Sequence, residues 1–114
     1  MGHVDQIRRT ALSLPRAYEV LVRDRVKFRV GSLVFLALSR DETVLGFAFP
    51  KEERPHLVAS RPDVFSMPVQ SDERYNWVHL RLGAIDPTEL HELVVDAWRM
   101  VVPKRVSAEF DRQA

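Results

Sequence analysis

The spacing of apolar residues changes twice along the chain, and these changes limit the fold more than any other feature. Apolar side chains recur at helical spacing over 4–14, alternate with polar ones over much of 18–49 and 75–82, and return to helical spacing after Asp86. The strand-like segments follow one another through short turns, which join antiparallel neighbours but not parallel ones. The sequence therefore predicts the α+β class, with an antiparallel sheet and N-terminal, middle and long C-terminal helices.

Five segments have the pattern of strands, and a sixth is short. They are residues 18–22, 25–30, 33–38, 43–49 and 75–82, with an edge segment at 64–65. The segment 33–38 is continuously apolar, which is typical of a central strand. In the segment 43–49 the small residues Val44, Gly46 and Ala48 share one face, which leaves room for a packed helix.

The long C-terminal helix has the clearest boundaries. Asp86 can cap its first turn, Pro87 suits the first helical position, and Glu89 can reach back to the cap. We expect this helix to run to about Val102. Residues 107–114 predict a loose tail, so the single domain should comprise residues 1–106.

Composition narrows the class of protein. At 114 residues the chain suits one domain, and its 46% of hydrophobic residues argue against disorder. It has no cysteine, which excludes disulfides, thiolate metal sites and cysteine nucleophiles. No apolar run approaches the roughly 18 residues of a membrane span, and the polar N-terminus lacks the apolar core of a signal peptide. We therefore expect a cytoplasmic protein with no membrane partner.

The sequence contains no recognisable pattern for catalysis or metal binding. Its four histidines are scattered at positions 3, 56, 79 and 91 and form no HExxH motif. Four glycines cannot build a glycine-rich phosphate loop, and no GxSxG motif is present. We expect no enzyme activity, no metal and no cofactor.

Basic residues are concentrated near the N-terminus, although the whole chain has a net charge of only +1. Residues 1–40 hold eight basic and three acidic residues, a net charge of +5, and the rest of the chain has a net charge of −4. Arg25, Lys27 and Arg29 share one face of a predicted strand, with Arg23 just before it. Side chains two apart on a strand lie about 6.6–7 Å apart, near the spacing of phosphates along a nucleic-acid strand. The alternative is a charged sheet edge that prevents aggregation.

The predicted strand 75–82 has a second unusual face. Tyr75, Trp77, His79 and Arg81 alternate with other residues and therefore point to one side. Aromatic rings and a guanidinium on one strand face can stack nucleic-acid bases, as in proteins that bind single strands. The alternative is that Trp77 packs under a helix or loop and that His79 is an ordinary surface residue.

Several segments together resemble the MmcQ/YjbR family. They are residues 11–15 (ALSLP), 26–30 (VKFRV), 33–38 (LVFLAL), 50–54 (PKEER), 61–65 (RPDVF), 77–82 (WVHLRL) and the helix that ends at 102–105 (VPKR). The resemblance covers roughly residues 7–106 and lies in the order and spacing of these segments. The resemblance implies a double-wing α+β domain similar in topology to type III secretion chaperones. Members of the family are often labelled DNA-binding. No catalytic residue set is established for them, so the resemblance implies none here.

The matching segments carry basic or aromatic residues at seven positions: Lys27, Arg29, Arg54, Trp77, Arg81, Lys104 and Arg105. The chain also departs from the family pattern. Arg16 stands where a glycine is common, Pro55 interrupts the middle helix predicted at 51–60, and residues 23–25 lack the usual glycine and histidine. These departures concern local turn geometry.

Two functions remain open from the sequence. The first is a DNA-binding module without enzyme activity, whose candidate contacts are Arg23, Arg25, Lys27, Arg29, Arg54, Tyr75, Trp77, Arg81, Lys104 and Arg105. The second is a protein-interaction adaptor or chaperone-like domain, which needs an exposed apolar patch or a self-association interface of at least about 1,000 Å². The family resemblance favours the first function, and the near-neutral total charge favours the second.

Overall fold

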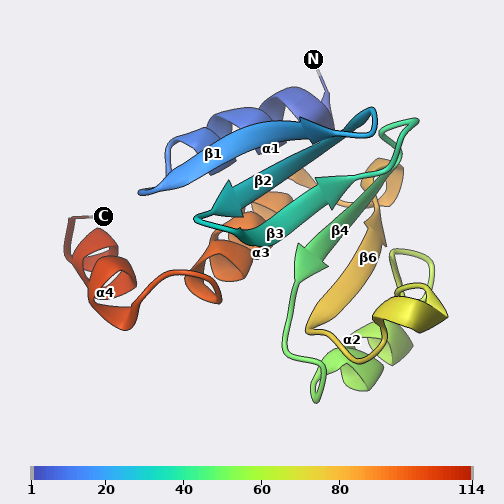
Figure 1. The fold of residues 1–114 in the computed structure, drawn as a ribbon. Helices are drawn as coiled ribbons and strands as arrows, with labels where there is room; N and C mark the ends of the chain where they lie inside the picture. The colour runs from blue at the N-terminus through green and yellow to red at the C-terminus, as the bar shows by residue number, and fades with distance from the viewer. Residues whose placement is uncertain (1, 114) are drawn as a thin grey trace.

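The computed structural model describes residues 2–113, which form four α-helices and a six-stranded sheet (Figure 1). The helices are α1 (His3–Leu12), α2 (Arg54–Ser60), α3 (Pro87–Arg99) and α4 (Lys104–Gln113). The strands are β1 (Ala17–Val22), β2 (Arg25–Val30), β3 (Leu33–Leu38), β4 (Val44–Ala48), β5 (Phe65–Ser66) and β6 (Trp77–Arg81). Two short 3₁₀ helices, η1 (Gln70–Asp72) and η2 (Leu82–Ala84), flank β6. The predicted α+β class is confirmed.

The strands follow the order β1-β2-β3-β4-β6-β5, and each neighbouring pair is antiparallel. In the turn between β1 and β2, Arg23 and Asp24 have φ angles of 51° and 67°, the two positive values that a type I′ hairpin turn requires. The continuously apolar segment is β3, which lies between β2 and β4 as expected for a central strand. The sheet is therefore a meander up to β4, after which the chain leaves it to form α2.

One face of the sheet is covered by helices and the other is open. In Figure 1, α1 and α3 lie behind the sheet, and no α-helix of the described chain lies over the face turned toward the viewer. The covered face supplies much of the core, through Phe28, Leu36, Leu45, Phe47, Val78 and Leu80. From α3, Trp98 is fully buried, and its indole N–H donates to the carbonyl oxygen of Pro15 at 2.8 Å.

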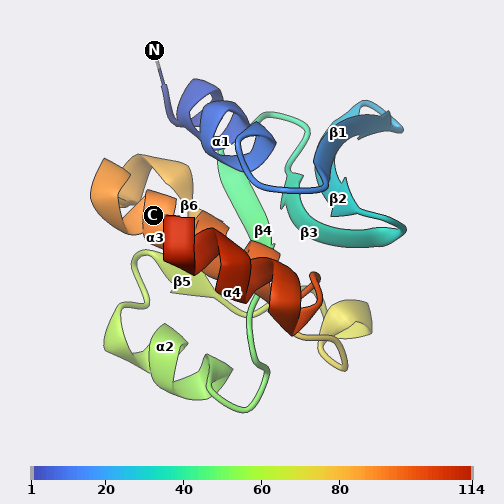
Figure 2. The same cartoon turned by 90° about the vertical axis from the view of Figure 1, so that its left-hand side faces the viewer.

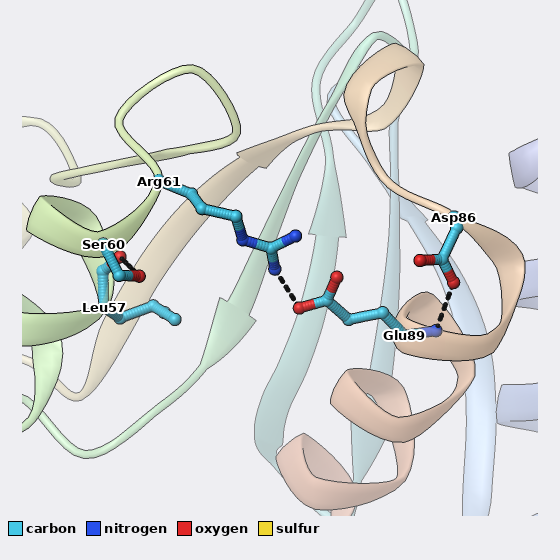
Figure 3. Close-up of polar contacts among 5 residues, drawn as sticks. All are labelled: Leu57, Ser60, Arg61, Asp86 and Glu89. Atoms are coloured by element: carbon cyan, nitrogen blue, oxygen red, sulfur yellow. Dashed lines mark hydrogen bonds and ion pairs between the residues drawn. The ribbon is translucent and has the colours of Figure 1, made fainter.

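The start of α3 follows the sequence prediction. The Asp86 carboxylate accepts a hydrogen bond from the backbone N–H of Glu89 at 2.9 Å, and Pro87 is the first helical residue. The Glu89 side chain does not reach back to Asp86; it forms an ion pair with Arg61 at the end of α2, as Figure 3 shows. This ion pair ties α2 to α3. The helix ends at Arg99, slightly before the expected position.

The prediction of a loose tail at 107–114 is wrong for residues 107–113, which belong to α4. The Phe110 ring packs edge-on against Trp98 with 5.0 Å between ring centroids, and Arg99 forms an ion pair with Asp111 at 2.7 Å. In Figure 2, α4 lies in front of α3. The helix is mostly polar, and its apolar residues packed against the core are Val106 and Phe110, so it leaves only a short apolar pattern in the sequence. The predicted domain and tail also include residues 1 and 114, which lie outside the described residues.

Candidate binding groove on the open face of the sheet

The register of the sheet places residues from four strands in one row on the open face. Lys27 of β2 is opposite Ala37 of β3, Ala37 is opposite Gly46 of β4, and Gly46 is opposite His79 of β6. With about 4.8 Å between neighbouring strands, the ends of this row are roughly 14 Å apart. A basic side chain and an imidazole therefore flank two small residues, Ala37 and Gly46, in this row.

A groove of about 520 Å³ lies on this open face. Arg25 and Lys27 of β2 line one side, and Tyr75, Trp77 and His79 line the other. The two features that stood apart in the sequence, the cationic strand face and the aromatic strand face, are thus brought into one concave site. We call this site the open-face groove.

The floor of the groove is built around Gly46. A Cβ atom placed on Gly46 would lie 2.6 Å from the indole nitrogen of Trp77, so the indole sits directly over this glycine. A glycine inside a strand often marks such a close approach. The small face of β4, formed by Val44, Gly46 and Ala48, was expected to leave room for a helix. It receives the Trp77 ring instead.

The basic side of the groove is formed by two cations of β2. Arg25 is exposed and Lys27 is half-buried, and within residues 2–113 neither forms an ion pair. Arg29 shares their face of β2 but does not line the groove, and Arg23 is exposed in the adjoining turn. The cations nearest the groove are therefore free to meet an anionic ligand.

Arg54 does not belong to this surface, which corrects its predicted role as a nucleic-acid contact. Its side chain is buried, with only 6% of the residue exposed. Its guanidinium donates to the carbonyl oxygens of Glu73, Tyr75 and Trp77 at 2.7, 3.1 and 3.0 Å. Through these three hydrogen bonds the Arg54 guanidinium has a structural role. It holds the segment 73–77, which forms one wall of the groove, in place.

The remaining predicted contacts lie outside the groove. Arg81 is exposed at the end of β6 and borders two other cavities, of about 740 and 270 Å³. Lys104 and Arg105 are exposed in the first turn of α4 and do not line the groove. Of the ten predicted residues, the groove is therefore lined by four: Arg25, Lys27, Tyr75 and Trp77.

The groove also has an apolar rim that the sequence did not reveal. Several of the exposed large apolar side chains of the described chain border it, namely Leu33, Val69, Tyr75 and Met100. They come from β3, from the segment around η1 and from the end of α3. Residues so far apart in the sequence are brought together only by the order of strands and helices, so no local pattern could have identified this rim.

His79 has an unusual electrostatic environment within the groove. Burial lowers the pKa of its imidazole below the ordinary value, and the nearby Asp72 carboxylate only partly opposes this shift. His79 is therefore neutral at neutral pH. Asp72 is the acidic residue of the lining, against the two cations of β2.

Among residues 2–113, no group of three or more His, Asp or Glu side chains is placed to hold a metal ion. No helix within that range is both long enough and apolar enough to cross a membrane.

Comparison with known proteins identifies the family. The model of the YjbR family matches residues 12–100. A crystal structure of Deinococcus radiodurans protein DR2400, whose family-model domain is DUF419, has a TM-score of 0.77 and 21% sequence identity, over 96% of this chain and 88% of that chain. At this identity the likeness supports the fold alone, and no curated protein matches the chain. Because the family model spans most of the chain, the resemblance seen in the sequence is confirmed, and the protein belongs to the YjbR family.

Proposed function

We propose that the protein is a non-enzymatic, cytoplasmic DNA-binding module and that its ligand binds in the open-face groove. The observation that carries this proposal is the groove itself, in which Arg25 and Lys27 face the aromatic side chains Tyr75 and Trp77. Neither cation forms an ion pair within residues 2–113. Cations neutralise phosphates and release their counterions, whereas aromatic rings stack on bases. The groove supplies both kinds of contact on one surface.

The experiment is a fluorescence-anisotropy titration with duplex and single-stranded DNA at about 50 and 200 mM salt. We expect affinity to fall steeply as salt increases. Arg25→Ala and Lys27→Ala should each lower the slope of log affinity against log salt by about 0.9 for duplex or 0.7 for a single strand, one released counterion each. Arg9→Ala, an exposed arginine on α1, is the matched control and should leave the slope unchanged. Binding to no DNA at the lower salt would refute the proposal.

A second candidate function, a protein-interaction adaptor or chaperone-like domain, is favoured by the apolar rim. Leu33, Val69 and Tyr75 are each more than half exposed, which is unusual for apolar side chains that border one groove. If this rim is a self-association surface, sedimentation should show concentration-dependent dimers. Val69→Lys should then abolish them, and Leu12→Lys, an exposed apolar position on α1, should not. A monomer at all concentrations would contradict the self-association form of this function.

A further inference from the structure

We infer that the open-face groove binds a single strand of nucleic acid rather than a duplex, with a base against Trp77 and the phosphates along β2. This inference rests on the proposed function and specifies its ligand. It follows from how Trp77 is seated, from the distance between the two sides of the groove and from the length of the basic row.

The Trp77 ring lies inside the groove and not on a projecting loop. Its indole sits over Gly46, and Trp77 is half-buried in the groove lining. Bases in a duplex are paired and stacked on one another, so their faces cannot reach a ring that lies in a concave surface. An unpaired base of a single strand can enter and stack there.

The two sides of the groove are separated by a distance that suits one strand. Lys27 and His79 are at opposite ends of a row of about 14 Å, with only Ala37 and Gly46 between them. A strand whose phosphates follow β2 can therefore direct its bases past Ala37 onto the Trp77 ring, which covers Gly46. A long side chain in place of Ala37 would block that path.

The basic row is longer than one nucleotide requires. Arg25 and Lys27 line the groove, and Arg29 continues the same face of β2 beyond it, so the three cations span about 13 Å at about 3.3 Å per residue. A free nucleotide could use only part of this row. The arrangement therefore fits a polymer with several phosphates better than a mononucleotide.

The aromatic wall is held in place before any ligand arrives. Arg54 donates to the carbonyl oxygens of Tyr75 and Trp77 as well as to that of Glu73. A preorganised wall lowers the entropy lost on binding. Arg54 thus acts as a positioning residue and not as a contact.

The test compares a single-stranded 12-mer, a duplex of the same sequence and a free nucleoside monophosphate. Binding is followed by anisotropy for the labelled DNAs, by competition for the nucleotide, and by tryptophan emission. Trp98 is fully buried on the covered side, so a ligand in the groove should change the emission of Trp77 alone. We expect the single strand to bind at least tenfold more tightly than the duplex and to quench this emission.

Three variants check the geometry. Trp77→Ala should weaken binding of the single strand roughly tenfold to a hundredfold, the usual range for loss of one stacked base. Trp77→Phe keeps a ring and should retain most of the affinity, but should abolish the quenching. Gly46→Ala displaces the indole of Trp77 and should weaken binding of the single strand more than binding of the duplex. Circular dichroism establishes that each variant is folded.

The outcomes distinguish the inference from the proposed function. If the duplex binds as tightly as the single strand, with no change in Trp77 emission, the inference is overturned while the proposed function stands. If the mononucleotide binds as tightly as the 12-mer, the assignment to a polymer is overturned. If no nucleic acid binds, the proposed function fails and the inference with it.

Discussion

The two faces of the sheet are made by the same strands but carry different kinds of side chain. On β4 and β6, Phe47 and Val78 point to the covered face and are fully buried under the helices. Their neighbours Gly46, Trp77 and His79 point to the open face and line the groove. Because side chains alternate along a strand, one strand can support the core and a binding surface without either interfering with the other. Substitutions on the two faces should therefore have separable effects.

The largest expected effect is on the covered face. Phe47→Ala removes a fully buried ring that contacts the Phe49 and Phe65 rings, with centroids 6.0 and 6.3 Å away. Truncation of a buried Phe leaves a cavity and costs about 3–5 kcal/mol of unfolding free energy. On the open face, Lys27→Ala should change stability by less than about 0.5 kcal/mol. Urea unfolding measures both values, and similar losses for the two variants would contradict the division of roles.

Alternation of side chains is a local property, and for this reason the sequence predicted the strands well. Phe28 and Val30 alternate with Lys27 and Arg29, and the structure places the apolar pair in the core and the basic pair on the open face. The helix start at Asp86 could be predicted equally well, because the capping residues lie close together in the chain. Local patterns thus predicted the fold class and most of the elements.

The groove itself depends on contacts between distant residues. That Lys27 and Trp77 border the same concavity follows from the strand order β2-β3-β4-β6 and its register, which no local pattern determines. The role of Arg54 was unpredictable for a similar reason. Its partners are backbone carbonyl oxygens about twenty residues away, and because every residue has such an oxygen, the sequence does not distinguish them. Gly46 did carry a signal of close approach, but only the register shows that Trp77 occupies the space.

The second prediction concerns Arg54, which connects the fold to the open face. Arg54→Ala should lower the unfolding free energy by about 1–3 kcal/mol, because hydrogen bonds from a buried charge are lost and three carbonyl oxygens lose their donor. Hydrogen exchange at amides 73–77 should also become faster, since the wall of the groove is no longer tied to α2. Arg81→Ala, an exposed arginine on β6, is the control and should change neither quantity. Equal effects of the two variants would refute the positioning role.

The third prediction uses the pKa of His79. Burial lowers this pKa in the folded protein below its ordinary value of 6.5, so the unfolded chain binds the proton more readily. The stability contributed by neutral His79 is therefore fully present above pH 6.5 and is lost as pH falls through the folded-state pKa. Urea unfolding between pH 5 and 7.5, at about half-unit steps, measures this. The unfolding free energy of the His79→Gln variant should depend less on pH than that of the wild type. His56→Gln, at an exposed position on α2, should behave as the wild type does.

The smallest effect is expected at the C-terminal cations. Lys104 and Arg105 match the family segments, yet they lie on α4, which packs on α3 through the contact between Phe110 and Trp98. Neither lines the groove, so Lys104→Ala and Arg105→Ala should change DNA affinity less than twofold and leave the salt slope unchanged. Anisotropy titrations of the Lys104→Ala, Arg105→Ala and Arg25→Ala variants with DNA compare their affinities and salt slopes. A loss of slope at Lys104 or Arg105 equal to that at Arg25 would mean that the ligand extends from the open face around the end of α3. The boundary between the two faces would then no longer limit the binding surface.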